Sequence, residues 1–321
     1  MIAYKYRGGP RCFTRDLASI TQDYFWAASL STLNDPLEAK YDSSPLADVL
    51  NLVDTINQDN TLSDNFQEMA DNLRRIGIFS LAAKYDDHKL WAHYAGSHTG
   101  FCVGYDVTLL KPLNNIKHNI VPISYAIHPA SLTLEDMLSN LDSFLQKTVG
   151  VKHIEWEHEQ ESRIVTDVYG KMEHDFRAIK SIHFGIKMPE KRIKQVMKAM
   201  RGRGITYYQM QTGTFNLEAM PLPDAYPTAS PYLYSIAPVT HYALATDPGD
   251  EERMALLPYL LKAVEIQRRE PYCSEVDYAG ASTDNAKAGQ IWVNYRYKSN
   301  YYNRHFTKRQ IRELHSQIID L

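Results

Sequence analysis

Four prolines within one short segment constrain the architecture of this chain more than any other feature. They are Pro221, Pro223, Pro227 and Pro231. Proline has no backbone N–H to donate and disrupts helices and central strands alike. We therefore predict an extended linker over residues 221–231. It divides the chain into a domain of residues 1–220 and a smaller domain of residues 232–321.

Strand-like and helix-like patterns alternate before the linker, which indicates an α+β domain. Short apolar or aromatic runs predict strands at residues 2–7, 23–28, 77–82, 100–105 and 182–186. Apolar residues with helical spacing predict helices at residues 62–76 and 133–147, a helical turn at 90–94 and a helix opened by Pro189.

The segment after the linker is predicted to be mainly helical. A helix is expected over residues 251–269, with a kink at Pro258, and Thr307 is expected to cap a last helix. Between them, the alternating residues 291–297 predict one strand.

Composition excludes several classes of protein. The net charge of −3 over 321 residues gives the whole molecule no attraction to nucleic acid or to a membrane. The three cysteines are odd in number and far apart, which argues against a disulfide framework and a cysteine zinc site. No apolar run is long enough to span a bilayer and no signal peptide is recognisable, so a cytoplasmic location is expected.

Two glutamates two residues apart form the most informative short motif. In an extended strand Glu159, Glu161 and Arg163 would share one face, because side chains there repeat every two residues. Neighbouring like charges repel unless a site uses or neutralises them. Two interpretations remain open: a surface charge ladder neutralised by Arg163, or a catalytic Glu-x-Glu strand.

Five short motifs occur in an order that resembles one bacterial domain-of-unknown-function family. They are Tyr4-x-Tyr6-Arg7, Asn34-Asp35-Pro36-Leu37-Glu38, Trp91-x-His93-Tyr94, His98-x-Gly100-Phe101-Cys102-Val103-Gly104 and Trp156-x-x-Glu159-x-Glu161-x-Arg163. Leu37 stands where that family usually has Phe. The resemblance covers residues 1–200 and implies no function by itself.

A looser resemblance is to mono-ADP-ribosyltransferases of the Arg–Ser–Glu class, because Arg7, Ser80 and Glu159-x-Glu161 follow in that order. It implies an ADP-ribosyltransferase-like split β-sheet core with flanking helices and NAD as substrate. By the resemblance, Glu161 stabilises the oxocarbenium-like ribose and Glu159 directs the acceptor. Ser80 departs from the usual Ser-Thr-Ser, since it stands in Phe-Ser-Leu-Ala.

The remaining NAD-binding side chains are also expected from the first half of the chain. By the same resemblance Arg7 and Ser80 hold NAD, and the further candidates for its pocket are Tyr6, Asn34, Trp91 and Tyr94. Each of them also has a plain structural interpretation, as a turn or core residue. No metal site is predicted, because His88, His93 and His98 repeat every five residues and so leave a common helix face.

Two basic stretches are candidates for nucleic-acid contact. Residues 187–203 are rich in Lys and Arg, and residues 295–312 mix basic with aromatic side chains. From the second stretch we select Arg296, Lys298, Arg304 and Lys308 as nucleic-acid-binding residues. A solvated helix face beside a tyrosine-rich strand is the alternative.

The leading hypothesis is an NAD-dependent ADP-ribosyltransferase, acting as a toxin or antiviral defence effector on a nucleic-acid or protein acceptor. Water as acceptor would make the protein an NAD glycohydrolase. An antitoxin protein is conceivable as a partner, and no membrane is involved. The alternatives are a non-enzymatic nucleotide or nucleic-acid binding module and a metal-dependent nuclease.

Overall fold

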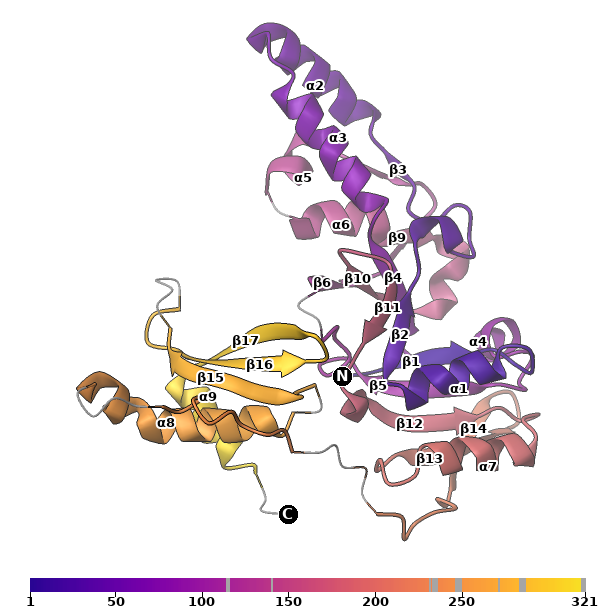
Figure 1. Ribbon diagram of the computed structural model, residues 1–321. Coiled ribbons are helices and arrows are strands. Elements are labelled where there is room, and N and C mark those ends of the chain that lie inside the picture. The colour runs from indigo at the N-terminus through magenta and orange to yellow at the C-terminus, as the bar shows by residue number, and fades with distance from the viewer. Residues whose placement is uncertain are drawn as a thin grey trace. The chain divides into compact units, whose positions relative to one another are not determined.

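The computed structural model of this chain describes residues 1–113, 116–139, 141–230, 232, 236–245, 250–270, 272–282 and 287–318. The contacts divide the chain into two units, Met1–Pro231 and Tyr232–Leu321 (Figure 1). We call them unit 1 and unit 2.

Unit 1 is built on an eight-stranded sheet. In spatial order its strands are β14 (Leu217–Leu222), β13 (Thr206–Thr212), β12 (Ile179–Phe184), β5 (Phe101–Asp106), β1 (Ile2–Arg7), β4 (Gly77–Ala82), β10 (Glu161–Thr166) and β6 (His118–Pro122). All neighbours are antiparallel except β12 and β13. The sheet loosens beside β1: that strand pairs with β5 along its whole length, but with β4 at Tyr4 and Ala82 alone.

Helices cover both faces of this sheet. On one face α1 (Phe13–Thr21) and α7 (Glu190–Ala199) pack on a core that includes Phe79, Phe101 and Phe184. On the other face α4 (His88–Tyr94) packs beside Tyr6 and Ala82.

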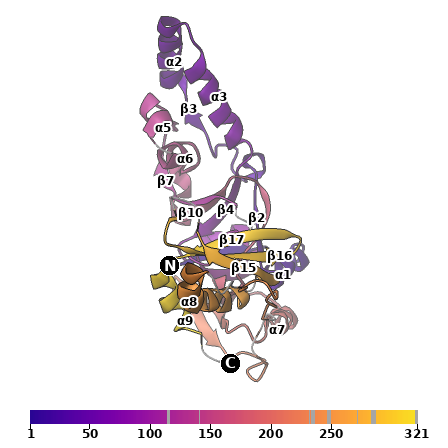
Figure 2. The same ribbon diagram turned by 60° about the vertical axis from the view of Figure 1, so that its left-hand side comes forward.

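Four more helices contact the β4–β10 end of the second face. They are α2 (Ser44–Asn57), α3 (Thr61–Leu73), α5 (Leu134–Ser139) and α6 (Leu141–Val149). The helices α2 and α3 lie side by side, as both views show (Figures 1 and 2). Leu46, Leu50 and Phe144 of this group bury their side chains with Ile78 and Val165 of the sheet.

Three small pairings complete unit 1. The strand β2 (Tyr24–Ala27) pairs antiparallel with β11 (Gly170–Glu173). Two parallel pairs are β3 (Tyr41–Asp42) with β8 (Ala130–Ser131), and β7 (Ser124–Ala126) with β9 (Val151–His153). Short 3₁₀ turns lie at η1 (Leu30–Thr32), η2 (Ile154–Glu159) and η3 (Phe176–Ala178).

Unit 2 is an antiparallel three-stranded sheet with helices, so the prediction of a mainly helical domain is wrong. The strands β15 (Glu275–Ala281), β16 (Ile291–Tyr297) and β17 (Asn300–Phe306) follow each other in space. The helices α8 (Glu251–Arg268) and α9 (Lys308–His315) supply Leu260, Val264 and Ile311 to a core shared with Val293 of the sheet. The sequence revealed β16 alone, because β15 and β17 are interrupted by small and polar residues.

The α+β class is confirmed, and the predicted strands are observed as β1, β2, β4, β5 and β12, with β1 and β4 matching the predicted bounds. The strands β6, β13 and β14 of the large sheet were not predicted. The predicted helix 133–147 is α5 and α6, and residue 140 lies outside the described residues. The predicted linker begins too early, because Pro221 and Leu222 belong to β14. Proline is tolerated there because β14 is at the edge of the sheet. Residue 231 of that linker also lies outside the described part of the chain.

The close packing of Gly100 against the backbone of β1 can be tested by substitution. A Cβ added at this position would stand 2.1 Å from the carbonyl oxygen of Arg7. We expect Gly100→Ala to lower the free energy of unfolding by about 1–3 kcal/mol or more, as overpacking does. In Gly8→Ala the added Cβ meets its nearest atom at 3.5 Å, an ordinary contact. Urea unfolding of both variants checks this, and an equally small effect of both would contradict it.

Candidate functional site

The two motif glutamates lie on different elements. Glu161 is the first residue of β10, whereas Glu159 is the last residue of η2. Between them Gln160 has a φ of 43°, a left-handed conformation that turns the chain. The prediction that Glu159 shares a strand face with Glu161 and Arg163 is therefore wrong. The turn nevertheless brings both carboxylates to one cation, Lys152 of β9.

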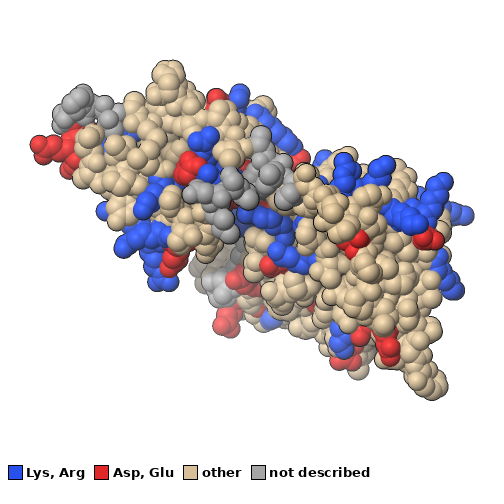
Figure 3. All heavy atoms as spheres, turned by 90° about the horizontal axis from the view of Figure 1, so that it is seen from below, with Lys and Arg blue, Asp and Glu red and all other residues tan. Residues whose placement is uncertain are grey.

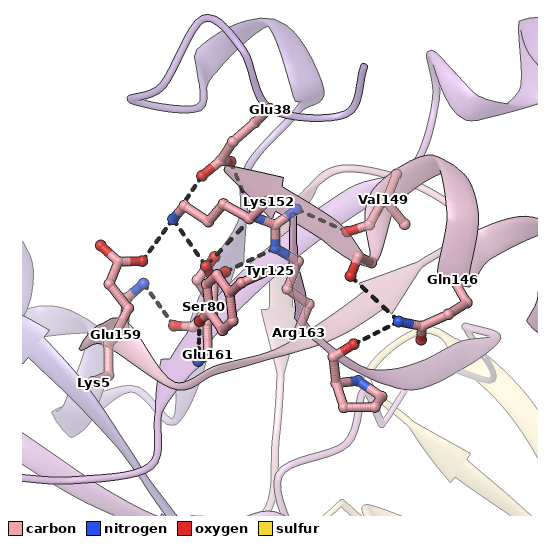
Figure 4. Close-up of polar contacts among 12 residues, drawn as sticks. Lys5, Glu38, Ser80, Tyr125, Gln146, Val149, Lys152, Glu159, Glu161 and Arg163 are labelled. Atoms are coloured by element: carbon pink, nitrogen blue, oxygen red, sulfur yellow. Dashed lines mark hydrogen bonds and ion pairs between the residues drawn. The ribbon is translucent and has the colours of Figure 1, made fainter. Parts of the chain in front are cut away.

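A buried cluster of charges surrounds that cation (Figure 4). It consists of Glu38, Lys152, Glu159, Glu161 and Arg163, whose side chains are between 0 and 7% exposed. We call it the charge cluster.

Lys152 and Arg163 join its three carboxylates. The Lys152 Nζ lies 2.8 Å from Glu38, 2.6 Å from Glu159 and 3.0 Å from Glu161. The Arg163 Nε lies 2.8 Å from Glu161, and its Nη2 lies 3.1 Å from Glu38. Because burying unpaired charges is costly, each member of the cluster needs the others.

Polar groups from four further segments form hydrogen bonds with the cluster or with its neighbours. The Tyr94 hydroxyl of α4 donates to Glu159 at 2.9 Å, and the side chain of Asn34 bonds to Tyr94. The side chain of Ser80 in β4 bonds to Glu161. The Tyr125 hydroxyl accepts the backbone N–H of Glu161 at 2.8 Å. The Lys5 ammonium donates to the carbonyl of Ser80 at 2.8 Å, across the loosened boundary of β1 and β4.

This environment keeps Glu161 and Lys152 ionised. Burial alone would raise the pKa of Glu161, but Arg163 and Lys152 hold that pKa down at about 2. Burial opposes the charge of Lys152 as well, yet the Glu161 and Glu38 carboxylates raise its pKa overall. The partly buried Lys5 differs, because desolvation lowers the pKa of its ammonium to about 8. Glu161 therefore carries a negative charge at neutral pH and has no carboxyl proton to donate.

A cavity of about 420 Å³ adjoins the cluster. Its lining is Leu30, Ser31, Leu33, Asn34, Asp35, Pro36, Glu38, Ala39 and Lys40. Glu38 belongs both to this lining and to the charge cluster. Asp35 uses one carboxylate oxygen to accept the backbone N–H of Leu37 at 2.8 Å, while its buried Oδ2 has no partner in the described structure. The cavity therefore presents acidic and amide groups to a small polar ligand.

The structure brings together five of the side chains selected from sequence. They are Asn34, Ser80, Tyr94, Glu159 and Glu161.

Arg7 does not join them. The strand register places Arg7 on the opposite face of the sheet from Ser80 and Glu161. There its guanidinium lies 5.9 Å from the ring centroid of Phe79 and donates to the Tyr105 hydroxyl at 3.4 Å. The expectation that Arg7 and Ser80 hold the same ligand is therefore wrong, because their side chains lie on opposite faces of the sheet.

Tyr6 and Trp91, which were candidates for the NAD pocket, lie in the core. Their rings contact edge to face with centroids 5.3 Å apart, and both are buried. The Tyr6 hydroxyl donates to the carbonyl of Lys84, and the Trp91 indole N–H donates to that of Tyr85.

Sequence reasoning missed three members of the site: Glu38, Lys152 and Lys5. Glu38 ends the motif that begins at Asn34, so its place there was a usable signal. Lys152 and Lys5 carried none, because the contacts that make them important join segments distant in sequence.

The residues selected for nucleic-acid binding in unit 2 do not form one surface. Arg296 and Arg304 lie on opposite faces of the sheet, as the pairing of β16 with β17 requires. Arg304 lies 2.9 Å from Glu270 and 4.6 Å from the ring centroid of Phe306. Arg296 lies 3.2 Å from Glu275. Lys298 and Lys308 lie over the rings of Tyr297 and Tyr259.

The described residues contain neither a candidate metal site nor a membrane-spanning helix. Those residues contain no group of three or more His, Cys, Asp and Glu side chains placed to hold a metal ion. None of the helices in the same part of the chain combines the length and apolar character needed to cross a bilayer.

Lys152 tests the energetics of the cluster. We expect Lys152→Met to lower the free energy of unfolding by about 3–5 kcal/mol, because it leaves buried carboxylates with too little positive charge. Lys194→Met is the matched control, since its ion pair with Glu190 is exposed and solvent screens it, so its loss should change stability little. Chemical denaturation measures both. Equal stability of the two variants would show that the cluster is not a structural requirement.

Acid should weaken the fold through Glu161. Its pKa is about 2 in the folded protein, against an ordinary value of 4.5. Ionised Glu161 therefore stabilises the fold above about pH 4.5, and this contribution is lost as the pH falls towards 2. Glu161→Gln lacks that contribution, so its stability deficit relative to wild type should shrink over the same range. Urea unfolding at several pH values measures the deficit, and a constant deficit would contradict the assignment.

Comparison with known proteins adds one finding. Residues 90–164 match the family described as "Protein of unknown function (DUF2971)". No curated protein and no solved structure is significantly similar to the chain. The matched segment includes α4, β5 and four members of the charge cluster: Lys152, Glu159, Glu161 and Arg163. This segment is therefore similar to a domain-of-unknown-function family, the kind of family that the ordered motifs predicted.

Proposed function

We propose that unit 1 binds NAD in the cavity beside Glu38 and transfers its ADP-ribosyl group to a macromolecular acceptor. The observation that carries the proposal is the position of Glu38. Glu38 is part of the cavity wall, and its carboxylate is held by the same Lys152 and Arg163 that hold Glu161. An acidic residue in a fixed position thus lies beside the space that a ligand would occupy.

The chemistry requires such a charge. When the bond between nicotinamide and ribose breaks, its electron pair leaves with nicotinamide and the ribose becomes an oxocarbenium-like cation. A preorganised carboxylate in a site that excludes water stabilises that cation. The acceptor then bonds to the ribose carbon and releases its proton. In this proposal Glu38 takes the part first expected of Glu161, and Glu161 and Glu159 lie behind it as anchors.

Neighbouring groups suit the rest of the ligand. The unpartnered Asp35 oxygen can accept a hydrogen bond from a ribose hydroxyl group. Lys40 is exposed at the cavity and can meet a phosphate. The single pairing of β1 with β4 supports the split sheet that an ADP-ribosyltransferase fold implies. Arg7 plays no part in NAD binding here, since it lies on the other face of the sheet.

A non-enzymatic nucleotide-binding module is the second candidate. The observation in its favour is that Glu159 and Glu161 are both buried and already neutralised by Lys152. In that case the cavity binds the nucleotide and leaves it intact.

Labelled NAD distinguishes the two candidates. Wild type, Glu38→Gln and Glu155→Gln are incubated with NAD labelled in its adenylate part and with cell lysate. We expect wild type to transfer label to macromolecules and to release nicotinamide. Glu38→Gln should reduce both by about 100-fold or more, as loss of one transition-state contact does. Glu155 lies on η2 outside the cavity lining, and its side chain is 82% exposed, so Glu155→Gln should match wild type.

The outcome is read from label transfer, free nicotinamide and calorimetric NAD binding, with thermal unfolding of each variant to verify folding. Nicotinamide release without transfer identifies water as the acceptor. Binding of NAD without turnover selects the non-enzymatic module. Absence of both binding and turnover in folded wild type contradicts the proposal.

A further inference from the structure

The helix α7 divides its side chains sharply between core and solvent. Ile193, Val196 and Met197 are buried against the sheet. Lys191, Lys194 and Lys198 are all exposed. Their spacing of three and four residues places them in one line along the helix, because such residues share a helical face.

Two more exposed cations flank the helix. Lys187 precedes α7 and Arg201 follows it, and the Arg201 guanidinium donates to the carbonyl of Lys198 at 3.0 Å. We call Lys187, Lys191, Lys194, Lys198 and Arg201 the basic ridge. Lys and Arg side chains gather at the right of Figure 3, which views the molecule from the side on which α7 lies in Figure 1.

Among the described residues, one weak ion pair partly neutralises the basic ridge. Glu190 lies 2.6 Å from Lys194, but the two side chains are 77% and 63% exposed, so the pair is weak. The whole chain carries a net charge of −3. A concentration of positive charge on an overall acidic molecule is a local feature, and it attracts polyanions locally.

We propose that the basic ridge binds the phosphate backbone of a nucleic acid. A row of cations along a helix can pair with successive phosphates, and the release of counterions drives such binding. The ridge holds no aromatic residue that could stack on a base, so it contacts the backbone and does not select sequence.

A membrane surface fits this helix less well. Helices that lie in a membrane interface bury an apolar face among the lipids. The apolar face of α7 is already used, since Ile193, Val196 and Met197 pack in the core of unit 1. The ridge could then offer a membrane only charge, whereas charge alone suffices for a phosphate backbone.

This inference deepens the proposed function, because it makes nucleic acid the class of acceptor. In that respect the inference rests on the proposed ADP-ribosyl transfer. The binding itself needs no NAD. It can therefore be measured on the full chain without any turnover at the cavity.

The test is fluorescence anisotropy of short labelled single-stranded RNA, single-stranded DNA and duplex DNA, titrated between about 50 and 200 mM salt. The ridge variant combines Lys191→Gln, Lys194→Gln and Lys198→Gln. The control variant makes the same net change of charge at exposed residues outside both basic stretches, with Lys89→Gln, Lys117→Gln and Lys262→Gln. Circular dichroism verifies that both variants are folded.

We expect wild type to bind with an affinity that falls steeply with salt. The ridge variant should bind at least about 10-fold more weakly at low salt, with a salt slope smaller by about 2. The control variant should stay close to wild type. Absence of binding by wild type, or equal loss in the ridge and control variants, would overturn the proposal.

Vesicles and a cavity variant complete the design. Stronger binding of wild type to vesicles of phosphatidylserine and phosphatidylcholine than to any nucleic acid would also overturn it. Glu38→Gln should bind nucleic acid like wild type. If that binding is present while NAD is never used, the ADP-ribosyl proposal alone fails; if NAD is used and the ridge variant binds normally, the ridge proposal alone fails.

Discussion

One ammonium group organises the interior of unit 1. Lys152 lies within 3.0 Å of carboxylates from a loop, a 3₁₀ turn and a strand. Three buried carboxylates this close would repel one another strongly without it, and Arg163 alone contacts only two of them. The conformation of residues 30–40 and that of the turn at Gln160 therefore depend on the same cation.

This dependence explains why short motifs from distant parts of the sequence occur together in one chain. Glu38 ends the second of the five motifs, Tyr94 ends the third, and Glu159, Glu161 and Arg163 belong to the fifth. In the structure these residues meet at the charge cluster or bond to its edge. Four of the five cluster residues lie in the segment that matches the family of unknown function, whereas Glu38 and the cavity lining lie outside it.

Local patterns predicted the strands of unit 1 well and the site only in part. Strands such as β1 and β4 are bounded by glycine or proline and filled with apolar residues, so they are readable from neighbours in sequence. The exclusion of Arg7 depends on strand register, and register is set by partners far along the chain. Glu159 was misplaced because one left-handed residue, Gln160, ended the expected alternation.

The loosened boundary in the large sheet has a mechanical consequence. Each half of the sheet keeps its own hydrogen-bond ladders, with β5 on one side and β10 on the other. The halves are joined there by the Tyr4–Ala82 pair and the clasp of Lys5 on the Ser80 carbonyl. Side chains of one core, such as Phe79 and Tyr105, hold the halves together across this boundary, where the backbone pairs only once. The Lys5 ammonium adds a contact whose charge depends on pH, because desolvation lowers its pKa to about 8.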